Sequence, residues 1–385
     1  MTSSRFMPTY TALELTNFLS YKSARIEFDD LVALIGPNAS GKSNLVAALK
    51  LLRDIPTYGL PLAIARRGGY DQLRHRSQGR PNDPAIRLEF RYGPGETGFY
   101  ELALASLKGK RYRVKRERAF LPIIDNHPDS FVSDGATVHS VEWDSETDGP
   151  PRSEERRVPV APGQSALSTG GFPAHLIQLA LSGLQTVEIH PARVGELQEP
   201  SSTAEFDPVG ANTASVFDAL DTAARAKIVE QLAAIVPGIV RIEPRVYADK
   251  RTLLFVQRTA HGNREFLAKQ MSDGTLRAFG ILLALAQPET PGLIVIEEPE
   301  VAIHLGALQS LIEILQAESR TMQVVLTTHS ADIVDELPVE SLRVVWSDTE
   351  QSRVANVSEH TRRILRDGLI TPGALLRADA LDPES

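Results

Sequence analysis

Short apolar runs that end in polar residues are the clearest pattern along this chain. Residues 31–35, 293–296 and 324–326 are apolar throughout, and the second run follows a turn-forming stretch rich in proline. Runs of this length without alternation are typical of strands that are buried on both faces. We therefore predict three buried strands in an open α/β sheet, with polar residues at the carboxyl end of each strand.

Helical and alternating patterns account for most of the remaining chain. Residues 45–52 carry leucines at helical spacing after the first predicted strand, and residues 171–236 contain further helical periodicity. Residues 85–145 include apolar–polar alternations that are typical of antiparallel strands. Residues 144–170 are rich in proline, serine, glycine and charge, which predicts a mobile loop.

A glycine-rich loop follows the first predicted strand. Residues 36–43 form a complete G-x-x-x-x-G-K-S pattern between a strand and a helix. Its glycines allow backbone N–H groups to surround phosphate oxygens at the start of a helix. We predict that Lys42 contacts the β- and γ-phosphates of ATP and that the Ser43 hydroxyl binds Mg²⁺. The loop residues predicted to bind the nucleotide are Gly36, Asn38, Ser40, Gly41, Lys42, Ser43 and Asn44.

Polar residues with catalytic potential follow the other two predicted buried strands. Glu297 and Glu298 end the second strand, at the edge of an open α/β sheet where ligands bind. We predict that Glu297 holds Mg²⁺ and that Glu298 is the general base that polarises the attacking water. His329 ends the third strand, where an imidazole can donate a hydrogen bond to the γ-phosphate. The predicted catalytic residues are therefore Glu298, His329 and Lys42.

A fourth motif, Ser272-Asp-Gly-Thr275, completes a recognisable order of motifs. The series resembles an ABC-type ATPase head and, within that class, the RecF-like and OLD-like (overcoming lysogenization defect) ATPases, over roughly residues 10–345. The resemblance implies that Ser272 and Gly274 cap the γ-phosphate of ATP bound to a second subunit, and hence an ATP-dependent homodimer. It also implies a metal-sensing glutamine, for which Gln72 and Gln185 are both candidates.

The expected fold is α/β, a P-loop NTPase of the ABC-ATPase head type with a mixed sheet, an antiparallel β-subdomain and a helical insert. The insert is too short for the sustained heptads of a long coiled coil. We expect residues 1–385 to form a single head, composed of a P-loop half (10–60), the β-subdomain (85–145), the insert (171–236), a half with the signature and acidic residues (238–346) and a C-terminal tail (347–385).

Composition narrows the class of protein. No apolar run approaches the roughly 18 residues of a membrane span, and the first residues lack a signal-peptide pattern. The 385 residues include no cysteine, which excludes disulfides and a thiol nucleophile and suits a cytoplasmic location. Only 56 residues follow His329, too few for the Toprim nuclease domain that OLD-type proteins often append, so a nuclease is expected to be a separate chain.

Basic residues cluster in two places although the net charge is −8. Residues 108–118 contain seven cations and one acid, and strand alternation places Arg111, Arg113 and Lys115 on one face. A solvated outer face of an antiparallel sheet is an equally compatible interpretation. The candidate DNA contacts are Lys108, Lys110, Arg111, Arg113 and Lys115. A second cluster comprises Arg66, Arg67, Arg74, His75, Arg76 and Arg80.

Three functions are compatible with these features. The favoured hypothesis is an ATP-hydrolysing, dimerising switch that controls a separate effector, such as a nuclease, in bacterial antiphage defence; the effector and the defence role are implied by the resemblance. The alternative is a RecF-like DNA-repair ATPase that clamps DNA through the basic strand. The third, a transporter ATPase subunit, is disfavoured because the Leu-Ser-Gly-Gly-Gln signature is missing from the sequence.

Overall fold

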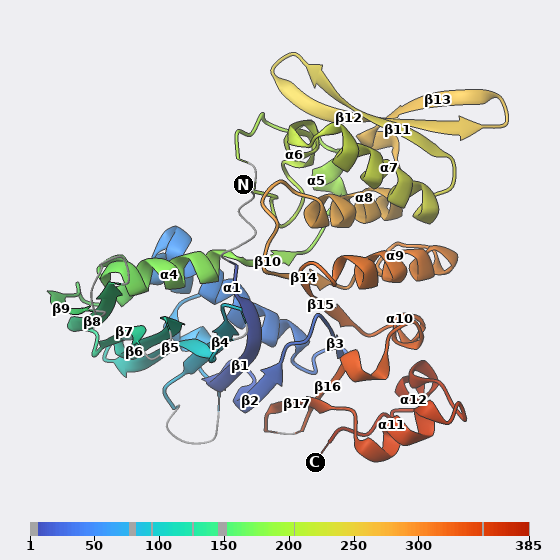
Figure 1. Ribbon diagram of the computed structural model, residues 1–385. Coiled ribbons are helices and arrows are strands. Elements are labelled where there is room, and N and C mark those ends of the chain that lie inside the picture. Colours follow the sequence, from blue (N-terminus) through green and yellow to red (C-terminus); the bar gives the residue numbers. More distant parts are fainter. Residues whose placement is uncertain are drawn as a thin grey trace.

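The computed structural model describes residues 7–76, 82–93, 95–124, 127–144, 152–203, 205–348 and 350–384. Arg80, a member of the second basic cluster, lies outside these described residues. Within them the chain forms a central sheet, a large antiparallel sheet and a small third sheet, separated by helices (Figure 1). No helix in the described ranges is long and apolar enough to cross a membrane.

The central sheet brings the three predicted buried strands together. In spatial order its strands are β10 (Leu184–Val187), β14 (Leu293–Glu297), β15 (Gln323–Thr328), β3 (Leu31–Ile35), β16 (Leu342–Ser347) and β17 (Ser352–Asn356). All neighbours pair in parallel except β16 and β17. The predicted strands β14, β15 and β3 are confirmed and lie side by side, so their carboxyl ends meet at one edge.

Burial on both faces explains why these strands are apolar throughout. Val32 belongs to a core that also contains α1 (Lys42–Tyr58). Its neighbour Ala33 belongs to a second core, which includes α8 (Asp273–Leu285) and α9 (Leu305–Glu318). Because helices or a second sheet cover each face, no position of β3 favours a polar side chain.

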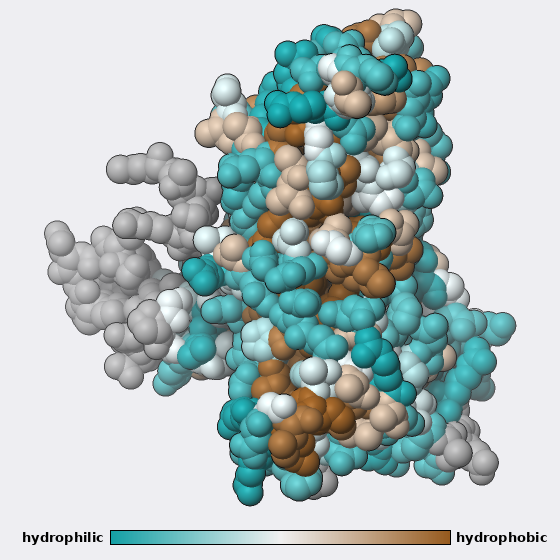
Figure 2. All heavy atoms as spheres, turned by 90° about the vertical axis from the view of Figure 1, so that its right-hand side faces the viewer, coloured by the Kyte–Doolittle hydropathy of each residue, from teal (hydrophilic) through white to brown (hydrophobic). Residues whose placement is uncertain are grey.

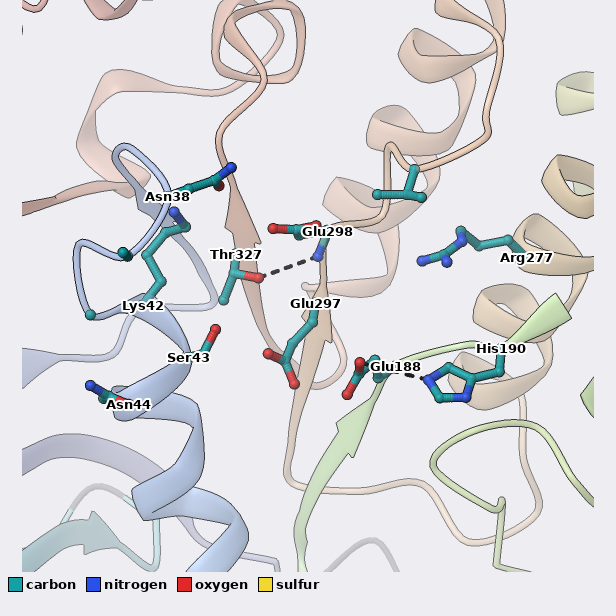
Figure 3. Close-up of a pocket in the computed structure, with 13 residues that line it drawn as sticks. Asn38, Lys42, Ser43, Asn44, Glu188, His190, Arg277, Glu297, Glu298 and Thr327 are labelled. Atoms are coloured by element: carbon teal, nitrogen blue, oxygen red, sulfur yellow. Dashed lines mark hydrogen bonds and ion pairs between the residues drawn. The ribbon is translucent and has the colours of Figure 1, made fainter. Parts of the chain in front are cut away.

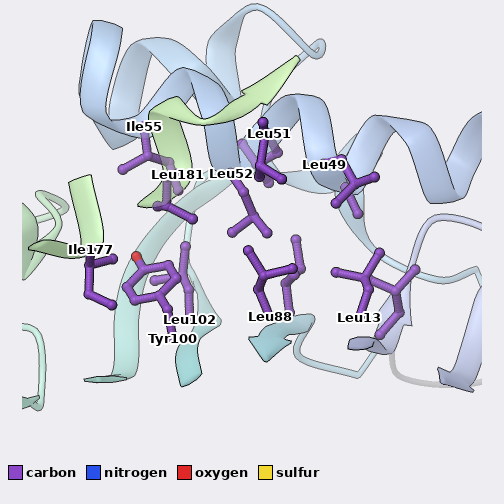
Figure 4. Packing of buried hydrophobic residues seen from close by; sticks show 14 of the residues in the cluster. Leu13, Leu49, Leu51, Leu52, Ile55, Leu88, Tyr100, Leu102, Ile177 and Leu181 are labelled. Carbon is purple, nitrogen blue, oxygen red and sulfur yellow. The ribbon is translucent and has the colours of Figure 1, made fainter. Parts of the chain in front are cut away.

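The antiparallel sheet covers α1 from the side opposite the central sheet. Its strands in spatial order are β2 (Tyr21–Glu27), β1 (Thr9–Phe18), β4 (Ala85–Arg91), β5 (Gly98–Leu107), β6 (Arg111–Ile124), β7 (His127–Ser133), β8 (Thr137–Asp144) and β9 (Arg152–Pro159). Leu49 and Leu52 of α1 pack toward Leu13 and Leu88 of the sheet (Figure 4). This core fixes the orientation of the helix that begins at the glycine-rich loop.

The prediction of a mobile loop over residues 144–170 is wrong for the central part of this segment, which forms strand β9. β9 pairs with β8 in an antiparallel register from Thr137 opposite Pro159 onward. Its side chains are almost all exposed, and Val158 alone among residues 153–159 is half-buried. Backbone hydrogen bonds to β8 therefore stabilise an edge strand whose composition is that of a loop.

The remaining elements differ from the predicted organisation in two ways. The segment expected to be a helical insert contains β10, a strand of the central sheet. A separate three-stranded sheet, β11 (Ile239–Tyr247), β12 (Lys250–Thr259) and β13 (Gly262–Leu267), precedes α8. The other helices are α2 (Leu60–Ala65), α3 (Tyr70–Leu73), α4 (Gly171–Ser182), α5 (Pro191–Gly195), α6 (Thr213–Ala219), α7 (Thr222–Ile235), α10 (Ala331–Asp335), α11 (Glu359–Arg366) and α12 (Pro372–Arg377), with 3₁₀ turns at Ala166–Ser168, Ala268–Gln270 and Val339–Ser341.

Candidate nucleotide-binding site

The glycine-rich loop joins the end of β3 to the start of α1, as the sequence predicts. Gly41 has a φ of 117°, in the left-handed region that favours glycine. A Cβ at this position would collide with the Ser352 side chain, and one at Gly36 with the Val345 carbonyl oxygen. Gly41 also gives α1 no side-chain cap, so the first-turn N–H groups of α1 point to where an anion would bind.

Lys42 is the first residue of α1, and its side chain folds back onto the loop. Its Nζ donates to the carbonyl oxygens of Gly36, at 2.8 Å, and Pro37, at 2.9 Å. Burial lowers the pKa of the Lys42 ammonium, while the charges of Glu298 and Glu300 act in the opposite direction. A buried ammonium held only by carbonyl oxygens is suited to exchange them for phosphate oxygens.

The loop and the strand-end acids line one cleft of about 560 Å³, a volume within the usual range of ligand pockets. Gly36 and Ser40 lie outside its lining, and the Ser40 hydroxyl is buried without a hydrogen-bond partner among the described residues. The predicted site residues that line the cleft are Asn38, Gly41, Lys42, Ser43, Asn44, Glu297 and Glu298.

Glu297 and Glu298 point in different directions (Figure 3). Glu297 ends β14 and turns toward Ser43, and its side chain is 13% exposed. Glu298 has a φ of 45°, and its N–H donates to the Thr327 carbonyl oxygen at 3.0 Å and is 3.2 Å from the Thr327 hydroxyl. This left-handed backbone turns the Glu298 carboxylate away from Glu297 and toward the side of the cleft that contains Lys42.

His329 lies next to the second of these acids. Its Nδ1 is 3.5 Å from the Glu298 carboxylate and 3.8 Å from that of Glu300. Glu300 accepts a hydrogen bond from the Thr328 hydroxyl at 2.6 Å, and its other carboxylate oxygen is buried with no partner among the described residues. The predicted pair of Glu298 and His329 is thus close in space, although His329 does not itself line the cleft.

Ser272 and Gly274 lie outside the cleft of their own chain. Ser272 caps α8, since its hydroxyl accepts from the Thr275 N–H at 3.2 Å, and it is exposed. A Cβ on Gly274 would collide with the Ala302 carbonyl oxygen, so the start of α8 packs against the loop that follows Glu298. Their role toward a second subunit stays a prediction.

Three ionisable residues of the cleft were not predicted from the sequence, namely Glu188, His190 and Arg277. Glu188 follows β10, a strand of four residues with no apolar run of its own, so its strand-end position carries no signal in the sequence. Arg277 lies on the second turn of α8 and forms no ion pair with the other described residues. Burial lowers the pKa of its guanidinium, against the opposing charges of Glu188 and Glu298.

Neither candidate for the metal-sensing glutamine lines the cleft. Gln185 is buried, and its Nε2 donates to the Phe206 carbonyl oxygen at 3.2 Å. Gln72 lies on α3, where its side chain accepts from Arg76 at 3.2 Å. The strand-end position beside the cleft belongs to Glu188 instead.

The residues of the cleft fit a magnesium nucleotide. The uncapped start of α1, the left-handed Gly41 and Lys42 form a cradle for phosphates. The Ser43 hydroxyl and the Glu297 carboxylate supply the oxygen ligands that Mg²⁺ prefers. Lys42 and Ser43 lie together at the start of α1, and Glu297 faces Ser43 across the cleft (Figure 3).

The basic strand predicted to contact DNA has the expected alternation. Arg111 and Arg113 are exposed on β6, whereas Val114 is buried. Several neighbouring cations are paired inside the fold, with Lys115 3.0 Å from Asp83 and Arg116 2.6 Å from Glu101. In the second cluster Arg67 is 2.9 Å from Asp54. The exposed cations at the start of β6, together with Lys108 and Lys110, remain available for an anionic partner.

Comparison with known proteins establishes the family of this chain. A family described as "AAA domain, putative AbiEii toxin, Type IV TA system" matches residues 31–335 of the chain. The chain belongs to this AAA family. The matched residues include the glycine-rich loop, both strand-end acids and His329. Membership of this family supports ATP binding and ATPase activity in general.

Two solved structures confirm the expected fold class, an ABC-ATPase head. The Smc head domain with an extended coiled coil from Pyrococcus furiosus, bound to the C-terminal domain of ScpA, has a TM-score of 0.58 at 12% identity, covering 94% of this chain and 100% of that one. An Smc head bound to the C-winged helix domain of ScpA has a TM-score of 0.59 at 13% identity, covering 92% and 99%. At these identities the likeness concerns the fold.

Curated relatives match a shorter segment. Structural maintenance of chromosomes protein 1 of Arabidopsis thaliana is 31% identical over 104 residues, which are 26% of this chain and 8% of that protein. The Schizosaccharomyces pombe protein of the same name is 26% identical over 114 residues, covering 27% of this chain and 9% of that protein. The chain thus spans only a small part of these relatives, and the narrower resemblance to RecF-like or OLD-like ATPases stays a prediction.

Proposed function

We propose that this chain binds ATP with Mg²⁺, hydrolyses it, and acts as a switch through ATP-dependent association with a second copy. One observation carries the proposal: Lys42 and the acids Glu297 and Glu298, distant in sequence, line the same cleft. The cleft therefore combines a phosphate cradle with one acid that can hold a metal ion and one that can accept a proton. Transfer of a phosphoryl group to water requires these groups.

Each of these side chains has a separate task in hydrolysis. Lys42 exchanges its bonds with the loop carbonyls for bonds with the β- and γ-phosphates. Ser43 and Glu297 are the residues that would hold Mg²⁺, which when bound neutralises charge on the phosphate oxygens. Glu298 accepts the proton of the attacking water, and His329 beside it donates a hydrogen bond to the γ-phosphate.

The second copy supplies the missing side of the γ-phosphate. Ser272 is exposed and Gly274 half-buried at the start of α8, outside their own cleft, so this helix start is in a position to meet a nucleotide of another subunit. Val301, 37% exposed, and Leu305, 65% exposed, flank Ala302 and Ile303 in sequence, whose backbone packs against Gly274 at this helix start. Exposed apolar residues beside a polar binding element are typical of a protein interface. A two-fold arrangement makes the two composite sites equivalent.

The biological role that we propose is control of a separate effector, such as a nuclease, in bacterial antiphage defence. The matched family's description names a toxin of a type IV toxin–antitoxin system, which supports a defence role. The motif order resembles OLD-like ATPases, which supports control of a nuclease. The effector is expected to join through a surface that changes with ATP-linked association.

A RecF-like, DNA-clamping ATPase is the second candidate function. The exposed cations Arg111 and Arg113 on β6, with Lys108 and Lys110 in the preceding turn, favour it. Binding to the phosphodiester backbone would weaken steeply with salt and would be lost on replacing these four residues by glutamine. If the chain acts only as a switch, its affinity for DNA should be as low as that of an acidic control protein at every salt concentration.

The experiment that tests the principal proposal combines calorimetry with ATP turnover. Lys42→Ala removes the ammonium that meets the phosphates, so nucleotide affinity is expected to fall at least about tenfold, the scale of a lost charged hydrogen bond. Lys22→Ala is the matched control, because Lys22 is an exposed lysine on β2 outside the cleft. Equal ATP affinity in the two variants would refute the assignment of the cleft.

A further inference from the structure

A second carboxylate stands beside Glu297 in the cleft. β10 and β14 are parallel neighbours, and their register pairs Val187 with Ile296. The next residues along these strands are Glu188 and Glu297, which therefore follow side by side at the sheet edge. Figure 3 shows both carboxylates turned into the same part of the cleft, in line with Ser43.

A lysine lies between the two carboxylates. The Lys50 Nζ is 2.6 Å from a Glu297 carboxylate oxygen and 3.5 Å from a Glu188 carboxylate oxygen. Lys50 follows Ser43 by seven residues on α1, so two helical turns place both side chains on the same face. Like charges at neighbouring strand positions repel, and the Lys50 ammonium offsets that repulsion when no other cation is present.

The two acids differ in their access to solvent. The Glu297 side chain is 13% exposed, whereas that of Glu188 is 51% exposed and lies 3.7 Å from the His190 Nε2. Glu188 therefore has the freedom to move toward a cation that Glu297 and Ser43 hold, without opening the core. Neither glutamine that the resemblance suggested reaches this position.

We propose that Glu188 is a second carboxylate ligand of the divalent cation in the nucleotide site, and that Lys50 is the counter-ion of the Glu188–Glu297 pair when the cation is absent. This inference rests on the proposed function. Mg²⁺ and Mn²⁺ prefer oxygen ligands, and each added anionic ligand strengthens their binding. Lys50 repels the cation by charge and competes with it for both acids, so removal of Lys50 strengthens cation binding.

The test measures Mn²⁺ affinity by electron paramagnetic resonance on the full chain, with a non-hydrolysable ATP analogue present. Glu188→Ala is expected to weaken Mn²⁺ binding about tenfold, and Lys50→Met to strengthen it several-fold, since one close charge is removed in each case. In Glu188→Ala/Lys50→Met the gain from removing Lys50 should be smaller than in Lys50→Met, because the ammonium then neutralises Glu297 alone. Glu188→Gln, which keeps the size of the side chain, is expected to fall between Glu188→Ala and the wild-type chain.

Glu196→Ala is the matched control, because Glu196 is similarly exposed, at 57%, and is paired with Arg193 at 3.2 Å outside the cleft. Mn²⁺ affinity in Glu188→Ala equal to that of Glu196→Ala, with analogue binding intact, would overturn this inference alone. A wild-type chain that binds neither the analogue nor Mn²⁺ would overturn the proposed function with it. Thermal unfolding curves of the variants show whether each one is folded.

Discussion

Replacement of Glu298 by glutamine separates nucleotide binding from hydrolysis. The contacts that hold this residue in place come from its backbone N–H, which is 3.0 Å from the Thr327 carbonyl oxygen and 3.2 Å from the Thr327 hydroxyl. An amide keeps the size of the side chain, and the Glu298 side chain is 41% exposed, so the fold loses little. The amide cannot accept the proton of the attacking water, and that loss is the expected effect.

The magnitude follows from the task assigned to this carboxylate. General-base catalysis contributes about 10²- to 10⁴-fold, or roughly 2.7–5.5 kcal/mol of barrier. We therefore expect single-turnover ATP hydrolysis by Glu298→Gln to fall at least about 100-fold, while calorimetry gives an ATP affinity close to that of the wild-type chain. The closeness of Glu298 to Lys42 leads us to expect slightly tighter ATP binding in the variant, since a negative charge leaves the cleft.

A second variant provides the comparison. Glu300→Gln removes an acid that is close to His329 but is held by the Thr328 hydroxyl at 2.6 Å, with a side chain only 10% exposed. Its effect on hydrolysis is expected to be smaller than that of Glu298→Gln, because a buried carboxylate bound to the fold cannot reach the water. Hydrolysis by Glu298→Gln within threefold of the wild-type rate would refute the assignment of the general base.

Two further predictions concern the second subunit and pH. Ser272→Arg should abolish hydrolysis and ATP-linked association, while ATP still binds the single chain. Ser358→Arg is the control: it removes the equivalent cap of α11, at about the same 1 kcal/mol cost, and should leave hydrolysis unchanged. Normal hydrolysis by Ser272→Arg would exclude a shared site. Because burial lowers the pKa of Lys42 and bound phosphates raise it, ATP binding at a pH above the lowered value should take up a proton, so affinity falls as pH rises. Calorimetry in buffers of different ionisation enthalpy measures this uptake, and an absence of uptake at every pH would contradict the assigned contact.

The parts of the site that depend on contiguous sequence could be predicted. The loop from Gly36 to Ser43 is one uninterrupted motif between an apolar strand and a helix, so both its conformation and its ligand follow from local residues. Glu297 and Glu298 could be predicted because an unbroken apolar run, Leu293 to Ile296, precedes them. In each case the residues that determine the local structure are neighbours in the chain.

The parts that depend on pairing between distant segments could not be predicted. β10 has only four residues, of which Gln185 and Thr186 are polar, and it is a strand because it pairs with β14 more than one hundred residues later. Glu188 was missed with it. β9 shows the same limitation, since its partner β8 supplies hydrogen bonds that its own composition does not reveal. Arg277 was missed because a single cation on an apolar helix carries no pattern of its own.

Hydrophobic residues on the outside of the molecule are not confined to one place. On the face shown in Figure 2 they form a broken band bordered by hydrophilic residues. Leu369, 78% exposed, and Ile370 lie between α11 and α12, apart from the loop that carries Val301. The interface proposed for a second copy is therefore argued from the position of Ser272 and Gly274, with the apolar residues near them as support.

Helix α8 links the two composite sites of the proposed dimer. Ser272 caps its start outside the cleft, and Arg277, five residues later, lines the cleft of its own chain. At about 1.5 Å of rise per residue these positions are about 7.5 Å apart along one helix. The helix between them is rigid, because Leu276, Ala278 and Phe279 are buried in the core. In the two-fold dimer that we propose, one helix would therefore contact the nucleotide of its own chain through Arg277 and that of the partner through Ser272.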